Sequence, residues 1–76
     1  MGDFFSHKLN NHFGVLQDDC KRLKLEVVIP IQQGKLMIEI RNKDGQAIDN
    51  QQVFRDEKIE TAAWRLHHRM KRGHIL

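Results

Sequence analysis

The sequence has a single cysteine, Cys20, a single proline, Pro30, and no tyrosine among its 76 residues. One cysteine cannot form an intramolecular disulfide, so we exclude a disulfide-stapled secreted scaffold and expect a reducing compartment, the cytoplasm. No apolar run approaches the roughly 18 residues of a membrane span, and no secretory leader is recognisable. We therefore expect a cytoplasmic protein with no membrane segment.

Motifs for catalysis and metal binding are also missing. There is no Walker loop, no dinucleotide-binding glycine motif and no nucleophile elbow. His67 and His68 point about 100° apart on a helix, and His7 and His12 are five residues apart, so neither pair has the spacing of a metal site. Cys20 falls on an apolar stripe and is expected to act as a small buried hydrophobe. These absences predict a protein that is not an enzyme, with no cofactor and no metal.

What the chain does have is enough apolar sequence for one small core. Hydrophobic residues make up 39% of the sequence. We expect residues 1–76 to form a single small α+β domain. Domains of this size leave much of their surface unburied, and a homodimer is compatible with that composition.

Positive charge is concentrated at the C-terminal end. Residues 1–54 carry seven Lys/Arg and seven Asp/Glu, whereas residues 55–76 carry six and three, which accounts for the net charge of +3. This asymmetry favours an anionic partner, most often nucleic acid. Part of it is also expected without any ligand, because acids at the start and bases at the end of a helix complement its dipole.

Helical periodicity at the N-terminal end predicts a first helix over residues 3–23. Asp3 is its expected cap, and Gly14 leaves open whether the helix is broken there. The apolar stripe consists of Phe5, Leu9, Phe13, Leu16, Cys20 and Leu23.

Alternating apolar residues then predict two strands joined at Gln33-Gly34, the first over residues 25–31 and the second over residues 36–41. Pro30 lacks an N–H and is expected to spoil one rung of the ladder. A two-residue turn would pair Ile31 with Leu36, Ile29 with Ile38 and Val27 with Ile40.

A second turn at residues 42–45 predicts a third, short strand over about residues 46–50. The turn would pair Ile40 with Ile48 and keep the apolar face intact. The outer face of the sheet would then carry a small apolar patch of Val28, Pro30 and Met37. A loop follows, with two apolar residues expected to turn inward: Val53 and Phe54.

The last predicted helix spans residues 59–72, with Asp56 as N-cap and Gly73 as its stop. Ile59, Ala63, Leu66 and Met70 form its apolar stripe. The order α-β-β-β-α predicts a two-layer α+β sandwich, with both helices on one face of a three-stranded antiparallel meander.

Residues 44–70 resemble the double-stranded-RNA-binding domain. The matching residues are Asp44-Gly45, Ile48, Ile59-Glu60-Thr61-Ala62-Ala63 and Leu66. The resemblance implies this α-β-β-β-α topology and a duplex-RNA partner. The lysine pair that the family carries at the start of its last helix falls on Asp56 and Glu57, and the loop between its first two strands is replaced by Gln32-Gln33-Gly34.

The basic stripe of the last helix is the expected functional surface. We expect it to bind the phosphate backbone of nucleic acid, duplex RNA or DNA, because guanidinium groups hold phosphate as a bidentate fork. Trp64 is expected either to stack on a base or to cover the edge of the core. The expected nucleic-acid-binding residues are Lys58, Trp64, Arg65, His68, Arg69, Lys71 and Arg72.

A second hypothesis is a protein-binding, inhibitory or adaptor module, such as mobile elements encode. It would use the same helix against an acidic protein surface, or the exposed sheet face or edge.

Overall fold

The computed structural model describes residues 11–76, in two helices and four strands. Helix α2 spans His12–Arg22 and α3 spans Ile59–Arg72; the strands are β1 (Glu26–Val28), β2 (Ile31–Gln32), β3 (Lys35–Arg41) and β4 (Ala47–Gln52). The predicted first helix is described from His12 onward and runs without a break through Gly14. Its expected start, with Asp3, Phe5, His7 and Leu9, lies outside the described residues.

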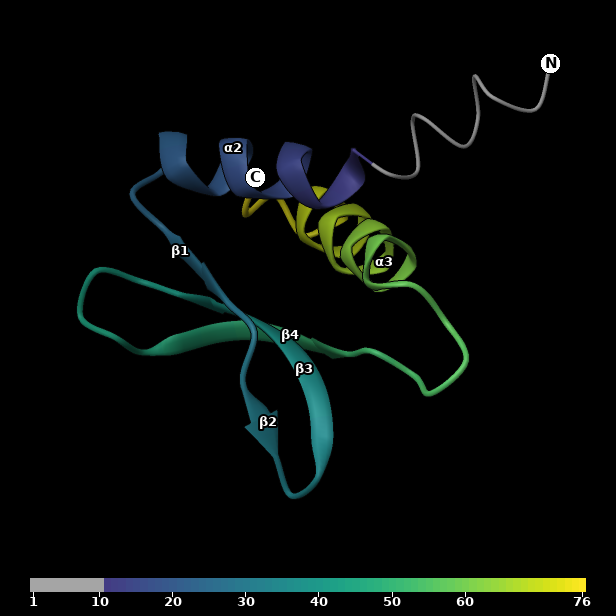
Figure 1. Cartoon of the computed structure of the whole chain (residues 1–76). Coiled ribbons are helices and arrows are strands. Elements are labelled where there is room, and N and C mark those ends of the chain that lie inside the picture. Colours follow the sequence, from purple (N-terminus) through teal and green to yellow (C-terminus); the bar gives the residue numbers. More distant parts are fainter. Residues whose placement is uncertain (1–10) are drawn as a thin grey trace, which may run out of the picture.

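The α+β fold is confirmed. Figure 1 shows both helices on one side of an antiparallel sheet in which β3 is central. β1 and β2 both pair with β3 along one edge, and β4 pairs with its other edge. The sheet has four strands where three were predicted, because the first predicted strand is interrupted.

Pro30 causes that interruption without changing the register. Val27 pairs with Ile40 before the gap, and Ile31 pairs with Leu36 after it, as predicted. The Pro30 carbonyl accepts a hydrogen bond from the Met37 N–H, but Pro30 has no N–H to donate to β3, so the ladder loses one hydrogen bond. The two-residue turn at Gln33-Gly34 has positive φ at both positions, as a type I′ turn requires.

The pairing of β3 with β4 differs from the prediction. Arg41 pairs with Ala47 but Ile40 pairs with Asp49, so Ile48 is the extra residue of a β-bulge. The predicted pairing of Ile40 with Ile48 is therefore wrong. Because side chains alternate along a strand, the bulge turns Asp49 and Gln51 toward the helices.

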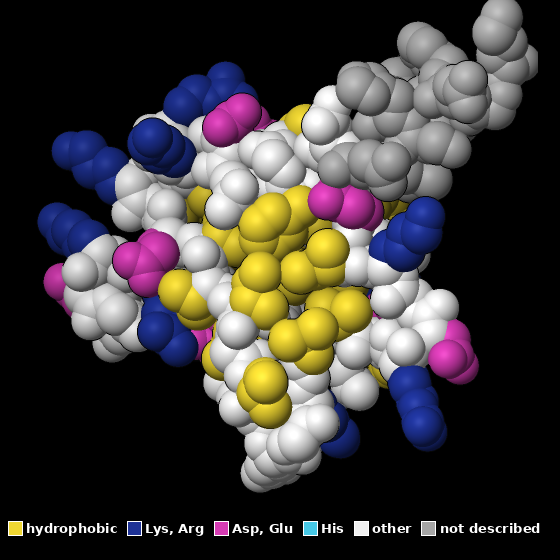
Figure 2. All heavy atoms as spheres, viewed as in Figure 1, with side chains coloured by type: hydrophobic (Ala, Val, Ile, Leu, Met, Phe, Trp, Pro, Cys, Tyr) yellow, Lys and Arg dark blue, Asp and Glu magenta, His cyan; other side chains and the backbone are white. Residues whose placement is uncertain are grey.

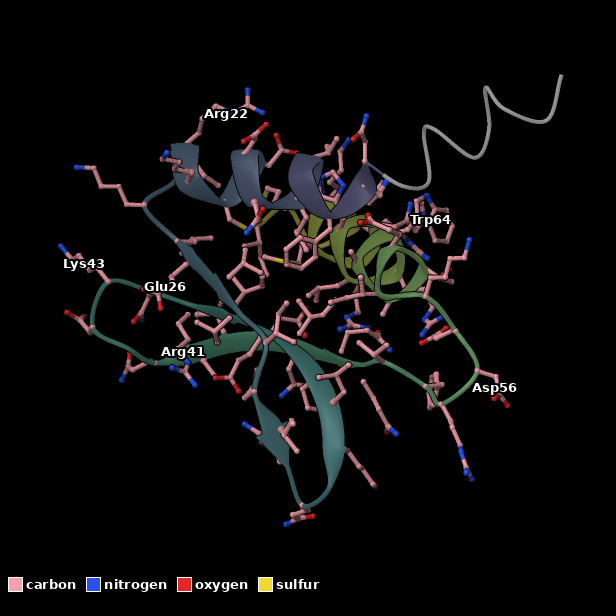
Figure 3. The ribbon with its side chains drawn as sticks, viewed as in Figure 1. Arg22, Glu26, Arg41, Lys43, Asp56 and Trp64 are labelled. Atoms are coloured by element: carbon pink, nitrogen blue, oxygen red, sulfur yellow. The ribbon has the colours of Figure 1, made fainter. Side chains whose placement is uncertain are left out.

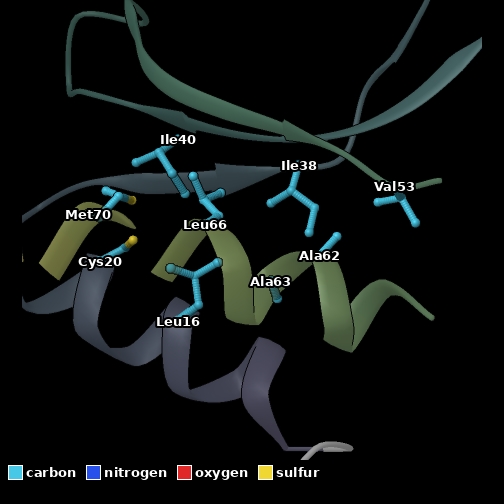
Figure 4. Close-up of a cluster of buried hydrophobic side chains, with 9 residues drawn as sticks. All are labelled: Leu16, Cys20, Ile38, Ile40, Val53, Ala62, Ala63, Leu66 and Met70. Atoms are coloured by element: carbon cyan, nitrogen blue, oxygen red, sulfur yellow. The ribbon is translucent and has the colours of Figure 1, made fainter. Parts of the chain in front are cut away.

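The core lies between the helices and β3, as Figure 4 shows. α2 contributes Leu16 and Cys20, and β3 contributes Ile38 and Ile40. The remaining buried hydrophobic residues are Val53 after β4 and Ala62, Ala63, Leu66 and Met70 of α3. The described residues of both predicted stripes thus join the core, except Leu23, which is 50% exposed. Cys20 is a buried hydrophobe, as expected.

The segment before α3 departs from the prediction. Lys58, not Asp56, is the N-cap residue, and no side chain caps the helix there. Phe54 is 52% exposed and does not turn inward, whereas Val53 is buried. Gly73 ends α3, as predicted.

Part of the helix-facing side of the sheet stays uncovered. Ile29, Ile31 and Leu36 belong to the register that faces the helices, but they lie beyond the reach of α2 and α3 and are exposed. Figure 2 shows hydrophobic side chains gathered on this face, between α2 and the β2–β3 hairpin. The patch expected on the opposite face, Val28, Pro30 and Met37, is only half-exposed.

Candidate nucleic-acid interface

The outer face of α3 carries an open hollow of about 630 Å³. It brings together five of the seven residues expected to bind nucleic acid. Its lining is Gln51, Trp64, Arg65, His68, Arg69, Arg72 and Gly73. Lys71 lines a neighbouring hollow, and Lys58 lies at the start of α3.

Trp64 and His68 form a flat, exposed stack. They are one helical turn apart, so their rings lie over one another, with centroids 5.2 Å apart and planes 8° from parallel. Trp64 is 46% exposed. Figure 3 shows it projecting from the outer side of α3, away from the sheet. The stack forms a wall shared by the two hollows.

Arg65 is held by Glu57 at the start of α3. Its Nη1 and Nη2 donate to the two carboxylate oxygens at 2.8 and 2.5 Å, and its guanidinium lies over the Phe54 ring. Glu57 also accepts a hydrogen bond from the Phe54 N–H. The hydrogen bonds from Arg65, and then that backbone N–H, lower the pKa of Glu57, so this carboxylate stays charged and neutralises the arginine.

Arg69 is held by β4. Nε and Nη2 donate to Asp49 at 3.2 and 3.0 Å, Nη1 donates to Gln51 Oε1 at 3.0 Å, and Nη2 also donates to the Asn50 carbonyl. The bulge at Ile48 makes this possible, because it turns Asp49 and Gln51 toward α3.

Arg65 and Arg69, which were expected to bind phosphate, are therefore not free to do so. Each is paired with a carboxylate from the chain itself, at the start of α3 or on β4. Within residues 11–76, Lys58, Lys71 and Arg72 form no ion pair and are exposed. The charge available to a ligand at the stack is that of Lys71 and Arg72.

A group of titratable residues that sequence reasoning missed lies behind the second hollow. This hollow, of about 340 Å³, is lined by His12, Val15, Trp64, His67, His68 and Lys71. His67 is buried and bridges Asp19 and His12 of α2. The positions of His12 and His67, 55 residues apart, gave no signal that the two rings meet.

In the described part of the chain, no three His, Cys, Asp or Glu side chains are grouped to hold a metal ion. No helix there is both long and apolar enough to cross a membrane. No protein-family model, curated protein or solved structure matches the chain.

Proposed function

We propose that this protein is a non-enzymatic module that binds nucleic acid, single strands in preference to duplexes, through the outer face of α3. The observation that carries the proposal is the exposed Trp64–His68 stack, with Arg72 on one side and Lys71 on the other. Unstacked bases bind to flat aromatic surfaces, and such contacts tolerate any sequence. In a duplex the base faces are already stacked on one another and cannot use this surface.

The internal ion pairs support a stacking mode over a backbone clamp. A guanidinium whose N–H groups already contact a carboxylate adds little net charge to its surroundings. Arg65 and Arg69 therefore line the hollow as groups whose guanidinium N–H donors are engaged within the chain. Lys71 and Arg72 supply the free charge for phosphates on either side of the stacked base.

Binding is best tested by fluorescence anisotropy with a short labelled single-stranded RNA, its DNA counterpart and an RNA duplex. Trp64→Ala should weaken single-strand binding by about 1–3 kcal/mol, roughly 5- to 150-fold. The double variant Lys71→Glu plus Arg72→Glu should weaken binding and flatten its salt dependence. Circular dichroism checks that each variant is folded.

The matched control is Lys35→Glu plus Lys43→Glu, which changes the net charge equally. Lys43 lies at the opposite end of the molecule from Trp64 (Figure 3). Arg65 and Arg69 are unsuitable for charge reversal, because a new carboxylate would face Glu57 or Asp49 and disturb the fold. If Trp64→Ala binds like the unmodified protein, the stack is not the site. Tighter binding of the duplex would instead favour backbone docking.

The exposed strip Ile29, Ile31 and Leu36 favours a second candidate function, protein binding. Ile31 is 74% exposed and borders a sheet edge with which no strand of residues 11–76 pairs; such an edge suits an added strand or a second copy of the chain. Ile29→Lys plus Ile31→Lys should abolish such an interaction without affecting nucleic-acid binding. Sedimentation velocity of the unmodified protein and of the double variant, each after nuclease treatment, measures whether the interaction is lost.

A further inference from the structure

A chain of hydrogen bonds through a buried histidine joins α2 to α3. His67 is 4% exposed; its Nε2 lies 2.6 Å from Asp19 Oδ2 and its Nδ1 lies 3.0 Å from His12 Nε2. The two imidazole rings meet edge to face, with centroids 5.1 Å apart. Asp19 and His12 belong to α2 and His67 to α3, so the three groups span the helix interface.

The number of protons on the two imidazole rings decides whether this chain of hydrogen bonds can form. A neutral imidazole has one N–H and one lone pair. If His67 donates Nε2–H to Asp19, its Nδ1 lone pair accepts from His12 Nε2–H. One added proton still leaves a donor and an acceptor between the rings, but it places a positive charge on His12 in a partly buried site beside Lys71. A second added proton puts an N–H on both facing nitrogens, so the bond is lost and two cations are held in contact.

We propose that the Asp19–His67–His12 chain is an acid-sensitive latch, which holds α2 against α3 near neutral pH and releases it on acidification. Release would separate Leu16 and Cys20 of α2 from the apolar face of α3 and open the hollow between the helices. The latch does not depend on the proposed nucleic-acid binding.

The surrounding charges come from the two helices. Glu60 of α3 favours a proton on His12, and Lys71 of α3 disfavours it. Glu60 also accepts a hydrogen bond from the Phe13 N–H at the start of α2, and Arg22 pairs with Asp19. His68 of α3 lines the hollow beside the two rings, and the neutral Cys20 thiol of α2 directly follows Asp19 in the sequence.

The direction of the pH effect follows from these surroundings. Burial, and then the neighbouring His67, lower the pKa of His12 below its usual 6.5. The released state therefore takes up the proton more readily than the latched state. The latch is fully stable above about pH 6.5 and weakens as the pH falls below that value. The hydrogen bond from His67 lowers the pKa of Asp19 below its usual 3.8, so this carboxylate keeps its charge while the latch opens.

Amide hydrogen exchange of the full chain, corrected for intrinsic exchange and followed from about pH 7.5 to about pH 4.5, measures the opening of α2. Each proton taken up on release should lower α2 protection by up to about tenfold per pH unit. Protection of β3 should change less over the same range, because the central strand opens only with the whole fold. Release of α2 with a slope of about one proton would support the latch.

His12→Gln tests the assignment, because the glutamine amide can still donate to His67 Nδ1 but does not titrate. This variant should lose the acid-induced drop in α2 protection. His68→Gln is the matched control, since it removes an exposed histidine from the same hollow, and it should keep the drop.

An α2 protection that is independent of pH, or an equal acid response in His12→Gln, overturns the proposal. If His12→Gln does not fold, nitrogen-15 shifts of the imidazole rings in the unmodified protein decide the question. Titration of His12 together with α2 opening supports the latch, and titration at a separate pH refutes it.

Discussion

Removing the two carboxylates that hold the arginines of α3 should strengthen binding to single-stranded nucleic acid. The double variant Glu57→Gln plus Asp49→Asn removes two negative charges and leaves an amide oxygen at each position. Glutamine can still accept from the Phe54 N–H, so the start of α3 stays in place. Each ion pair is partly exposed, and its loss should lower the free energy of unfolding by only about 0.2–1 kcal/mol.

The size of the effect can be worked from the charges at the stack. In the unmodified protein, Lys71 and Arg72 are free to neutralise about two phosphates, which predicts a slope of about −1.4 for log K against log salt. With Arg65 and Arg69 released the count is about four, and the slope becomes about −2.8. A fourfold rise in salt should then weaken the unmodified protein about sevenfold and the variant about fiftyfold.

Anisotropy titrations of a labelled single-stranded RNA at several salt concentrations measure both slopes. The matched control is Asp18→Asn plus Asp44→Asn, which raises the net charge equally at residues that form no ion pair with the described chain. An unchanged slope in the Glu57/Asp49 variant, or an equal change in the control, would show that the guanidinium groups do not reach the ligand.

Two further predictions concern the core. Leu66→Ala should lower the free energy of unfolding by about 2–5 kcal/mol, because Leu66 is fully buried between the helices and the sheet. The control is Ile31→Ala, which should change the free energy of unfolding by less than about 0.5 kcal/mol because Ile31 is 74% exposed. Urea denaturation measures both values. Burial, and then the charge of Asp19, raise the pKa of the Cys20 thiol to about 11. Cys20 should therefore react with a thiol reagent at pH 8 only after unfolding, and rapid labelling of the folded protein would contradict the buried position.

Local patterns in the sequence predict most of the fold. The four-three-four spacing of apolar residues in 59–72 predicted α3 and the face that it buries, because a helix repeats every 3.6 residues. Alternation on either side of Gln33-Gly34 predicted the first hairpin and its register, since side chains on a strand repeat every two residues. Even the break at Pro30 follows from the missing N–H.

The partners of the charged residues could not be predicted from these patterns. A single inserted residue, Ile48, changes the register of β4 and turns Asp49 toward Arg69, 20 residues away. Sequence periodicity placed the arginines on the outer face of α3, but it does not show which acids lie beside them.

The sequence by itself therefore determined the elements, the hairpin register and the apolar faces, because neighbouring residues dictate local geometry. Tertiary packing decided which titratable groups meet: Arg69 with Asp49, and His67 with Asp19 and His12. Such contacts depend on how helices and strands distant in the sequence lie against one another, and their charge state depends on the burial that results.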